Sequence, residues 1–104
     1  MSYNLGNIVK ASVISVTLSP ALVAANTTAE QTFTVNGLQI ADWVGVSKPT
    51  TQAGLAVTGA RVSAANTLAI AFGNFTASGI TPTASQVYSV MVVRPDSTIT
   101  DGNI

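Results

Sequence analysis

Few side chains in this sequence could do chemistry. The 104 residues include no His and no Cys, so the usual general base near neutral pH, the commonest metal ligand and a thiolate nucleophile are all missing. The chain has four carboxylates, Glu30, Asp42, Asp96 and Asp101. A glycosidase needs two carboxylates that face each other across a sugar bond, and nothing in this spacing indicates such a pair.

Serine chemistry and metal binding are equally poorly supported. Ser12 and Ser47 lie close in sequence to Lys10 and Lys48, but neither serine lies in a Gly-x-Ser-x-Gly turn. The chain contains no Asp-x-Asp-x-Asp loop for calcium, and its glycines are too dispersed for a phosphate-binding loop. We therefore expect a protein that is not an enzyme and that has no metal site and no cofactor.

The charge content points instead to contact with other proteins. Only 8% of the residues are charged, against about 25% in an ordinary soluble domain, and the charges cancel to zero. No basic patch indicates a nucleic acid, no cationic face indicates a membrane surface, and no apolar run reaches the 18 residues of a transmembrane helix. Polarity comes from 14 Thr, 10 Ser and 7 Asn. We interpret this surface as one that contacts neighbouring proteins, with a neutral soluble domain as the alternative.

The elements that position these residues are predicted to be strands. Alternating apolar and polar residues predict six of them, at Ala11–Leu18, Glu30–Val35, Trp43–Val46, Leu55–Val62, Thr67–Phe75 and Gln86–Arg94. Turn-forming pairs such as Asn36-Gly37 separate the runs. The Gln86–Arg94 run is apolar on both faces, which predicts a strand that is central or covered on both sides.

We therefore expect an all-β fold, an antiparallel β-sandwich of six to seven short strands that is Ig-like or jelly-roll-like, with a small barrel as the alternative. The stretch Leu38–Trp43 has room for a helical turn. At this length the chain forms one domain. We expect an N-terminal arm at residues 1–7, the β-sandwich domain at residues 8–95 and a polar C-terminal tail at residues 96–104. "NTT" at Asn26 and "NFT" at Asn74 match the N-glycosylation pattern, but we interpret both asparagines as turn and strand-end residues.

The candidate site residues are therefore contact residues. Trp43, the only tryptophan, is expected to fill the end of the core or a subunit interface rather than to stack on a sugar ring. Arginine is enriched at interfaces, so two arginines are candidates, although a solvated strand edge explains them equally well. The full set of interface candidates is Tyr3, Leu5, Trp43, Arg61, Phe75 and Arg94.

Two segments carry a resemblance to a known class of protein. "TTAEQTFTVNGLQIADWVGVSKPT" and "GLAVTGARVSAANTLAIAFGNFTASGITPTASQVYSVMVV" resemble a recurrent pattern in small tailed-phage virion proteins. The matching positions are Glu30–Val35, Gly37–Leu38, Asp42, Gly59–Ser63, Asn66–Ile70, Thr81–Thr83 and Tyr88–Val92. The resemblance covers about two-thirds of the chain, from Thr27 to Val93.

The resemblance implies a non-enzymatic virion component, and within that class a capsid decoration or cement protein. Such a protein sits on the capsid exterior, after synthesis in the host cytoplasm, and holds the shell against internal DNA pressure. The partners it implies are the major capsid protein and further copies of the chain itself, expected as a homotrimer, with no nucleic acid and no membrane.

Two alternatives stay open. The first is a tail-fibre, spike or head-fibre module that binds a host surface glycan, with Trp43 and Tyr88 as stacking residues. The second is a bacterial surface or pilus subunit, which requires cleavage of the segment Lys10–Ala25. That segment has an apolar stretch like a signal peptide, but serines and threonines interrupt it and a single lysine provides its positive charge.

Overall fold

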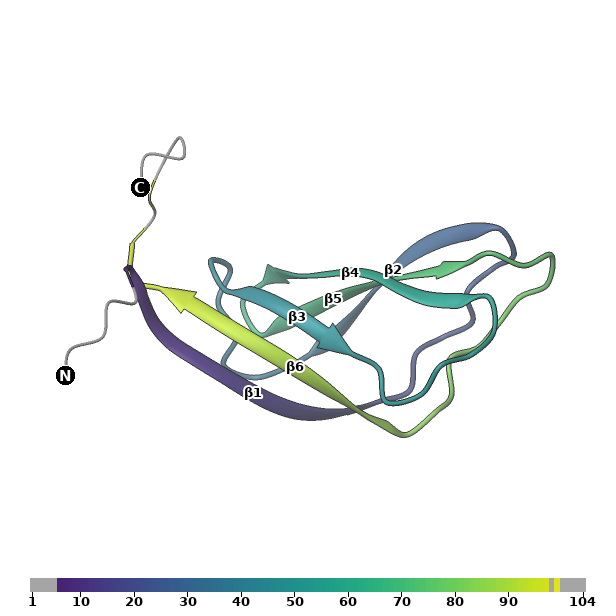
Figure 1. Ribbon diagram of the computed structural model, residues 1–104, viewed down its shortest axis with the longest axis horizontal. Coiled ribbons are helices and arrows are strands. Elements are labelled where there is room, and N and C mark those ends of the chain that lie inside the picture. Colours follow the sequence, from purple (N-terminus) through teal and green to yellow (C-terminus); the bar gives the residue numbers. More distant parts are fainter. Residues whose placement is uncertain (1–5, 98, 100–104) are drawn as a thin grey trace.

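The computed structural model describes residues 6–97 and 99, and these form two antiparallel sheets of three strands each (Figure 1). The strands are β1 (Ile8–Leu18), β2 (Thr27–Thr34), β3 (Trp43–Ser47), β4 (Leu55–Ala64), β5 (Thr67–Asn74) and β6 (Gln86–Pro95). All six predicted strands are present, and the predicted all-β sandwich is confirmed. Among the described residues, no helix is long and apolar enough to span a membrane.

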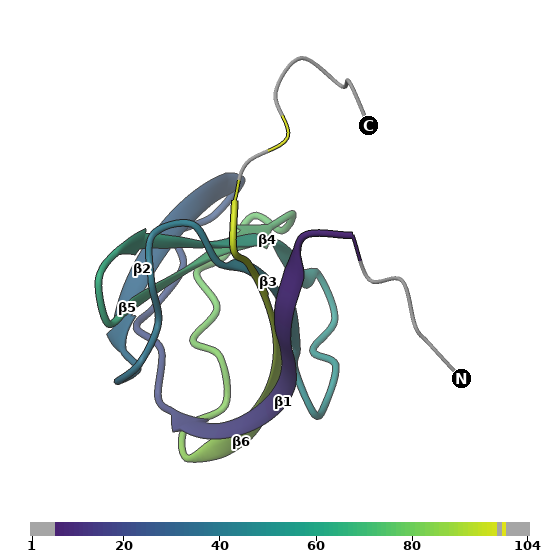
Figure 2. The same cartoon turned by 90° about the vertical axis from the view of Figure 1, so that its left-hand side faces the viewer.

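Each sheet has one central strand. The first sheet has the order β1-β6-β3 and the second has the order β2-β5-β4. Figure 2 shows the two sheets as layers that enclose the interior. The other four strands are edge strands. On one side of the sandwich the edge strands β3 and β4 lie beside each other, and β1 and β2 are the edge strands on the opposite side. The prediction that Gln86–Arg94 is a central strand is therefore confirmed.

The core lies between the inward faces of the two central strands. β6 contributes Tyr88, Val90 and Val92, and β5 contributes Leu68, Ile70 and Phe72, all of them buried. These residues occupy alternate positions because successive side chains of a strand point to opposite sides of its sheet. Half-buried apolar residues of the edge strands close the sides of the core.

Two buried polar side chains differ in how well they are satisfied. The amide of Asn74, at the end of β5, donates to the carbonyls of Val23 (3.0 Å) and Ser78 (2.8 Å), and its oxygen accepts from the Thr76 amide (2.9 Å) and hydroxyl (2.7 Å). Among the described residues, the buried Tyr88 hydroxyl has no hydrogen-bond partner, and burial raises its pKa. Asn74 thus acts as a strand-end residue, as expected.

The connection between β2 and β3 carries the chain from one sheet to the other. Gly37 has a φ of 99°, a value that favours glycine, within the turn that Asn36-Gly37 predicted. The predicted helical turn at Leu38–Trp43 is wrong. The segment instead forms a β-turn in which the Asp42 amide donates to the Gln39 carbonyl (2.9 Å).

The start of β1 and the end of β6 are neighbours. The two strands pair from Ile8 opposite Pro95 to Leu18 opposite Gln86, and the Asp96 amide continues the pairing by donating to the Asn7 carbonyl (2.8 Å). The last residue of the expected arm and the first residue of the expected tail therefore contact each other. Residues 1–5 of the arm, and most of the tail, lie outside the described residues.

Candidate functional site

The outward side of the β1-β6-β3 sheet carries four large apolar residues that are exposed, Val13, Trp43, Val87 and Met91. The register places Val13 and Gly45 on either side of Met91, and Ala11 and Trp43 on either side of Val93. Val87 follows at the other end of β6, beside Thr17. We call this outward side the β6 face; its apolar members are Ala11, Val13, Trp43, Val87, Met91 and Val93.

The large residues of the β6 face are open to solvent. The exposed fractions are 70% for Val13, 64% for Trp43, 52% for Val87 and 46% for Met91. The Trp43 indole lies over Gly45, as the distance shows: a Cβ atom at that glycine would be 3.9 Å from the indole Cη2. Trp43 therefore does not fill the end of the core, and the other expectation, a contact surface, stays open for it.

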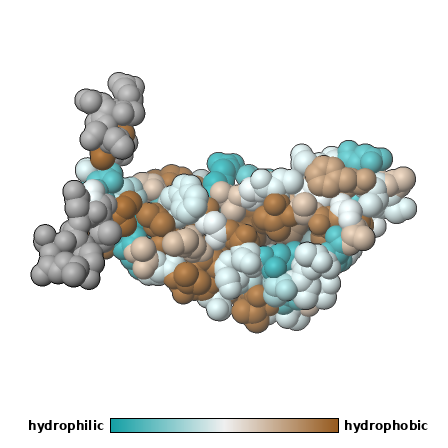
Figure 3. Space-filling model, in the orientation of Figure 1, coloured by the Kyte–Doolittle hydropathy of each residue, from teal (hydrophilic) through white to brown (hydrophobic). Residues whose placement is uncertain are grey.

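No charged side chain interrupts the β6 face. Its other outward positions on the three strands are small or hydroxylic, namely Ser15, Thr17, Gly45, Ser47 and Ser89. Figure 3 shows apolar residues gathered along the strands that face the viewer, with pale uncharged residues between them. Contiguous exposed apolar surface of this kind marks sites of protein contact more often than scattered single residues do.

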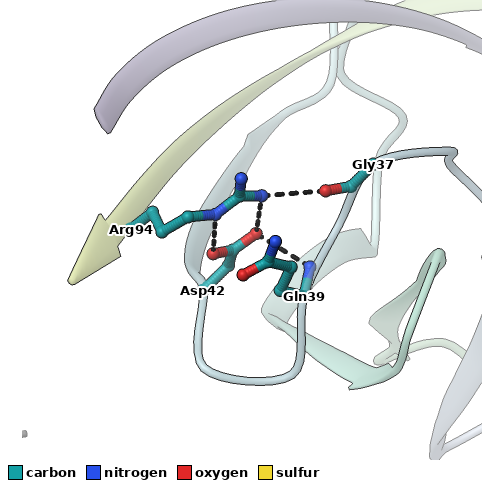
Figure 4. A network of polar contacts seen from close by, with 4 residues as sticks. All are labelled: Gly37, Gln39, Asp42 and Arg94. Carbon is teal, nitrogen blue, oxygen red and sulfur yellow. Dashed lines mark hydrogen bonds and ion pairs between the residues drawn. The ribbon is translucent and has the colours of Figure 1, made fainter. Parts of the chain in front are cut away.

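Arg94 lies on β6 but points away from this face. Its Nε and Nη2 atoms donate to the two carboxylate oxygens of Asp42, both at 2.8 Å, and Nη2 also donates to the Gly37 carbonyl (2.8 Å) (Figure 4). The Asp42 carboxylate in turn accepts from the Gln39 amide (2.9 Å). The Asp42 side chain is fully buried and that of Arg94 is 19% exposed. The guanidinium thus fixes the β2–β3 connection against β6.

Bidentate pairing determines the ionisation of these two groups. The hydrogen bonds from Arg94 hold the pKa of the Asp42 carboxyl below its ordinary value, and they outweigh the opposing effect of burial. The same contact raises the pKa of Arg94. Both side chains are therefore charged at neutral pH, and together they carry no net charge.

The outward side of the β2-β5-β4 sheet, which we call the β5 face, is built differently. Its central strand presents small residues, Ala69, Ala71 and Gly73. Above them, Arg61 of β4 donates through Nε (2.9 Å) and Nη2 (2.8 Å) to the carboxylate of Glu30 on β2. Ala69 is fully buried although it points outward. This bidentate contact lowers the pKa of Glu30.

The predicted interface residues do not form one cluster. Trp43 lies on the β6 face, Arg61 on the β5 face, and Phe75 just beyond the end of β5, where it is 64% exposed. The carboxylate of Asp42 and the carbonyl of Gly37 engage Arg94, so a solvated strand edge is the wrong explanation for this arginine. Tyr3 and Leu5 lie outside the described residues.

The predicted interface residues do not include three exposed members of the β6 face, Val13, Val87 and Met91. The signal was present, since Val87 and Met91 made Gln86–Arg94 apolar on both faces. β6 is the central strand of its sheet, which is one of the two arrangements that this pattern predicted. One side of β6 lies against the core, and the other is open to solvent.

The chemistry available elsewhere in the described part of the chain is limited. The Lys48 ammonium donates to the Thr50 carbonyl (2.9 Å) and to Oε1 of Gln86 (3.2 Å), not to a serine. A cavity of about 110 Å³ has Lys10, Ser12 and Arg94 among its lining residues. Within residues 6–97 and 99, no three His, Cys, Asp or Glu side chains gather where they would hold a metal ion.

Comparison with known proteins adds no name to this geometry. The chain matches no family model, no curated protein and no solved structure. The resemblance to small tailed-phage virion proteins stays a prediction from the sequence segments quoted above.

Proposed function

We propose that this chain is a non-enzymatic structural protein of a tailed-phage virion that works by protein–protein contact. Within that class we propose a capsid decoration or cement protein, which binds the outer capsid surface and stabilises the shell. The observation that carries the protein-contact part is the uncharged, apolar β6 face, with Val13, Trp43 and Met91 exposed together. The virion part is supported by the sequence resemblance.

The properties of the β6 face suit a decoration protein. Apolar contact does not depend on ionic strength in the way that contact between opposite charges does, because salt screens charges. Aromatic residues and methionine, both present here, are enriched in protein interfaces. Each contact can be weak, because several linked contacts to one shell raise the overall affinity through effective concentration.

Free sheet edges supply a second means of contact. β1 and β2 are outer strands of their sheets. An outer strand has unpaired backbone groups that can add to the sheet of a neighbour. The extension of a neighbour's sheet by the edge at Thr27–Val35 is therefore part of the proposal.

Co-sedimentation tests this function directly. The probe is the capsid shell of the phage that encodes the chain, prepared without the chain. We expect saturable binding to the shells and a higher temperature of shell disruption once the chain is bound. We also expect both effects to persist in 0.5 M NaCl, because the proposed contact is uncharged.

A matched pair of variants shows whether the β6 face is responsible. Trp43 and Phe75 are equally exposed, at 64% each, but only Trp43 lies on the β6 face. Trp43→Ser should weaken shell binding at least tenfold, whereas Phe75→Ser should bind like the wild type. Equal binding by both variants would remove the β6 face from the proposal, and no binding by the wild type would overturn the decoration function.

A host-glycan module is the second candidate, and one observation favours it. Phe75 lines an open depression of about 540 Å³, together with Asn26, Thr27 and Thr28. An exposed ring beside amide and hydroxyl groups has the composition of a sugar-binding surface. Tyr88 cannot contribute, because it is fully buried in the core.

Glycan binding would be measured on an array of host surface polysaccharides. Binding that is lost in Phe75→Ser and retained in Trp43→Ser would support the glycan module over the decoration protein. Binding to none of the glycans would leave the decoration protein as the proposal.

A further inference from the structure

The charge pattern of the β6 face suits contact with an identical surface. In a two-fold contact each residue meets a residue of the same surface, so any net charge on that surface is opposed by a like charge. The β6 face has no charged outward residue on its three strands. Its one nearby arginine is turned inward and neutralised by Asp42.

We propose that the β6 face binds a second copy of this chain, sheet against sheet, about a two-fold axis. This inference rests on the proposed function and narrows it: a second copy covers the β6 face, and the pair reaches the shell through its remaining surfaces, such as the free edges of β1 and β2. Like residues would then meet like, with apolar residues against apolar residues and hydroxyls against hydroxyls. No side chain would leave an unpaired charge in the contact, which is the most costly outcome of burial.

Met91 lies closest to the expected axis. It is near the middle of the ten-residue central strand and has Val13 on one side and Gly45 on the other. A two-fold axis through the middle of the face therefore places Met91 next to the Met91 of the second copy. Trp43 lies beside Val93, away from this midpoint, so it would contact residues of the second copy other than that copy's Trp43.

The dimensions of the face predict a weak dimer. The ten residues of β6 extend about 34 Å, and three strands about 4.8 Å apart give a width of about 15 Å. A face of this size is smaller than the surface of about 800 Å² that each partner contributes to a standard interface. We therefore expect a dissociation constant in the micromolar range, so that the dimer forms at high concentration and on a crowded shell.

The first measurement is the mass in solution by sedimentation equilibrium, from about 5 to 500 μM. We expect the mass to rise with concentration from 10.5 kDa towards twice that value. The rise should not weaken in 0.5 M NaCl. A constant monomer mass over the whole range would overturn the inference, as would a limiting mass of three subunits.

Charge exchange at Met91 tests the two-fold geometry itself. Met91→Lys and Met91→Glu each bring like charges together at the axis, so each variant alone should dimerise at least tenfold more weakly. An equimolar mixture of the two should recover dimers, because Lys then faces Glu. A mixture that stays monomeric, or single variants that dimerise like the wild type, would overturn this arrangement.

Folding of the variants is checked by their thermal transitions, which should match the wild type because Met91 is exposed. Trp43→Ser and Phe75→Ser again serve as the matched pair, and only the first should weaken the dimer. A wild type that stays monomeric but binds shells through Trp43 would overturn the self-contact and retain the proposed function. A wild type that dimerises but binds no shell would retain the self-contact and overturn the decoration function.

Discussion

The two sheets of this sandwich direct their arginine–carboxylate pairs to opposite sides, one outward and one inward. Each sheet has one bidentate arginine–carboxylate pair: Arg61 with Glu30 over the β5 face, and Arg94 with Asp42 on the inner side of β6. The outward pair spans the small central strand and helps to bury Ala69. The inward pair holds a connecting segment and leaves the β6 face without charge.

This difference shows how a small domain can close one surface and keep another available. The β5 face is covered by side chains of its own sheet, so little apolar area is left to gain by binding. The β6 face presents large apolar residues that no other part of the described chain covers. The position of a guanidinium, inside or outside a sheet, thus decides which surface can serve as an interface.

Removing the inward pair should have the largest effect on stability. Asp42→Ala leaves the partly buried guanidinium of Arg94 without its carboxylate and frees the Gln39 amide, so we expect a loss of about 3 kcal/mol in the free energy of unfolding. Urea denaturation measures this loss. A loss below about 1 kcal/mol would show that the two pairs are equivalent and would break the comparison.

Substitutions of the buried Asn74 and Tyr88 side chains should change the free energy of unfolding with opposite signs. Asn74→Ala removes four hydrogen bonds and leaves the Thr76 amide without its acceptor, so we expect a loss of about 2 kcal/mol. Tyr88→Phe removes a hydroxyl that has no partner, so we expect a gain of about 1 kcal/mol. Thermal and urea denaturation of both variants provide the measurement. Destabilisation by Tyr88→Phe would show that the hydroxyl is satisfied after all.

Acid should affect the chain through the same carboxylates. The pKa of Asp42 is lowered in the folded chain, so its stabilising contribution is complete above the ordinary Asp value of about 3.9 and is lost as the pH falls through the folded value. We therefore expect stability to change little from pH 8 to 5 and to fall below about pH 4. In Asp42→Asn this acid-dependent decrease should be smaller. An unchanged decrease would assign it to other carboxylates.

Removing the outward pair should have the smallest effect. Glu30→Gln breaks an exposed ion pair, and such pairs contribute little because water and salt screen them. We expect the melting temperature to shift only slightly and the shift to vanish in 0.5 M NaCl. Self-association should be unchanged, because Glu30 lies on the β5 face. A loss of stability that persists in 0.5 M NaCl would mean that this ion pair stabilises the fold more than its exposure indicates.

The strands could be predicted from the sequence because their periodicity is local. Each run alternates over a few residues, and the structure keeps the predicted inward sets, such as Leu68, Ile70 and Phe72. Pairings between distant residues could not be predicted in the same way. Asp42 and Arg94 lie 52 positions apart, and only the fold brings them together.

The contact surface was predictable only in part. The apolar pattern on both sides of Gln86–Arg94 predicted a strand that is central or covered on both sides, but a sequence does not say whether an outward apolar face is covered. Trp43 is the only tryptophan of the sequence, but the alternation of residues does not say that its indole lies exposed on the sheet, over Gly45. The helical turn expected at Leu38–Trp43 is wrong because β3 begins at Trp43, which leaves room only for the β-turn closed by the Asp42 amide and the Gln39 carbonyl.

The pairing of Asn7 with Asp96 has a practical consequence for engineering. Because the first and last strands are neighbours, the sandwich begins and ends within one inter-strand spacing, about 5 Å. A host protein could therefore accept residues 7–96 within a single surface loop without separating the two ends of that loop.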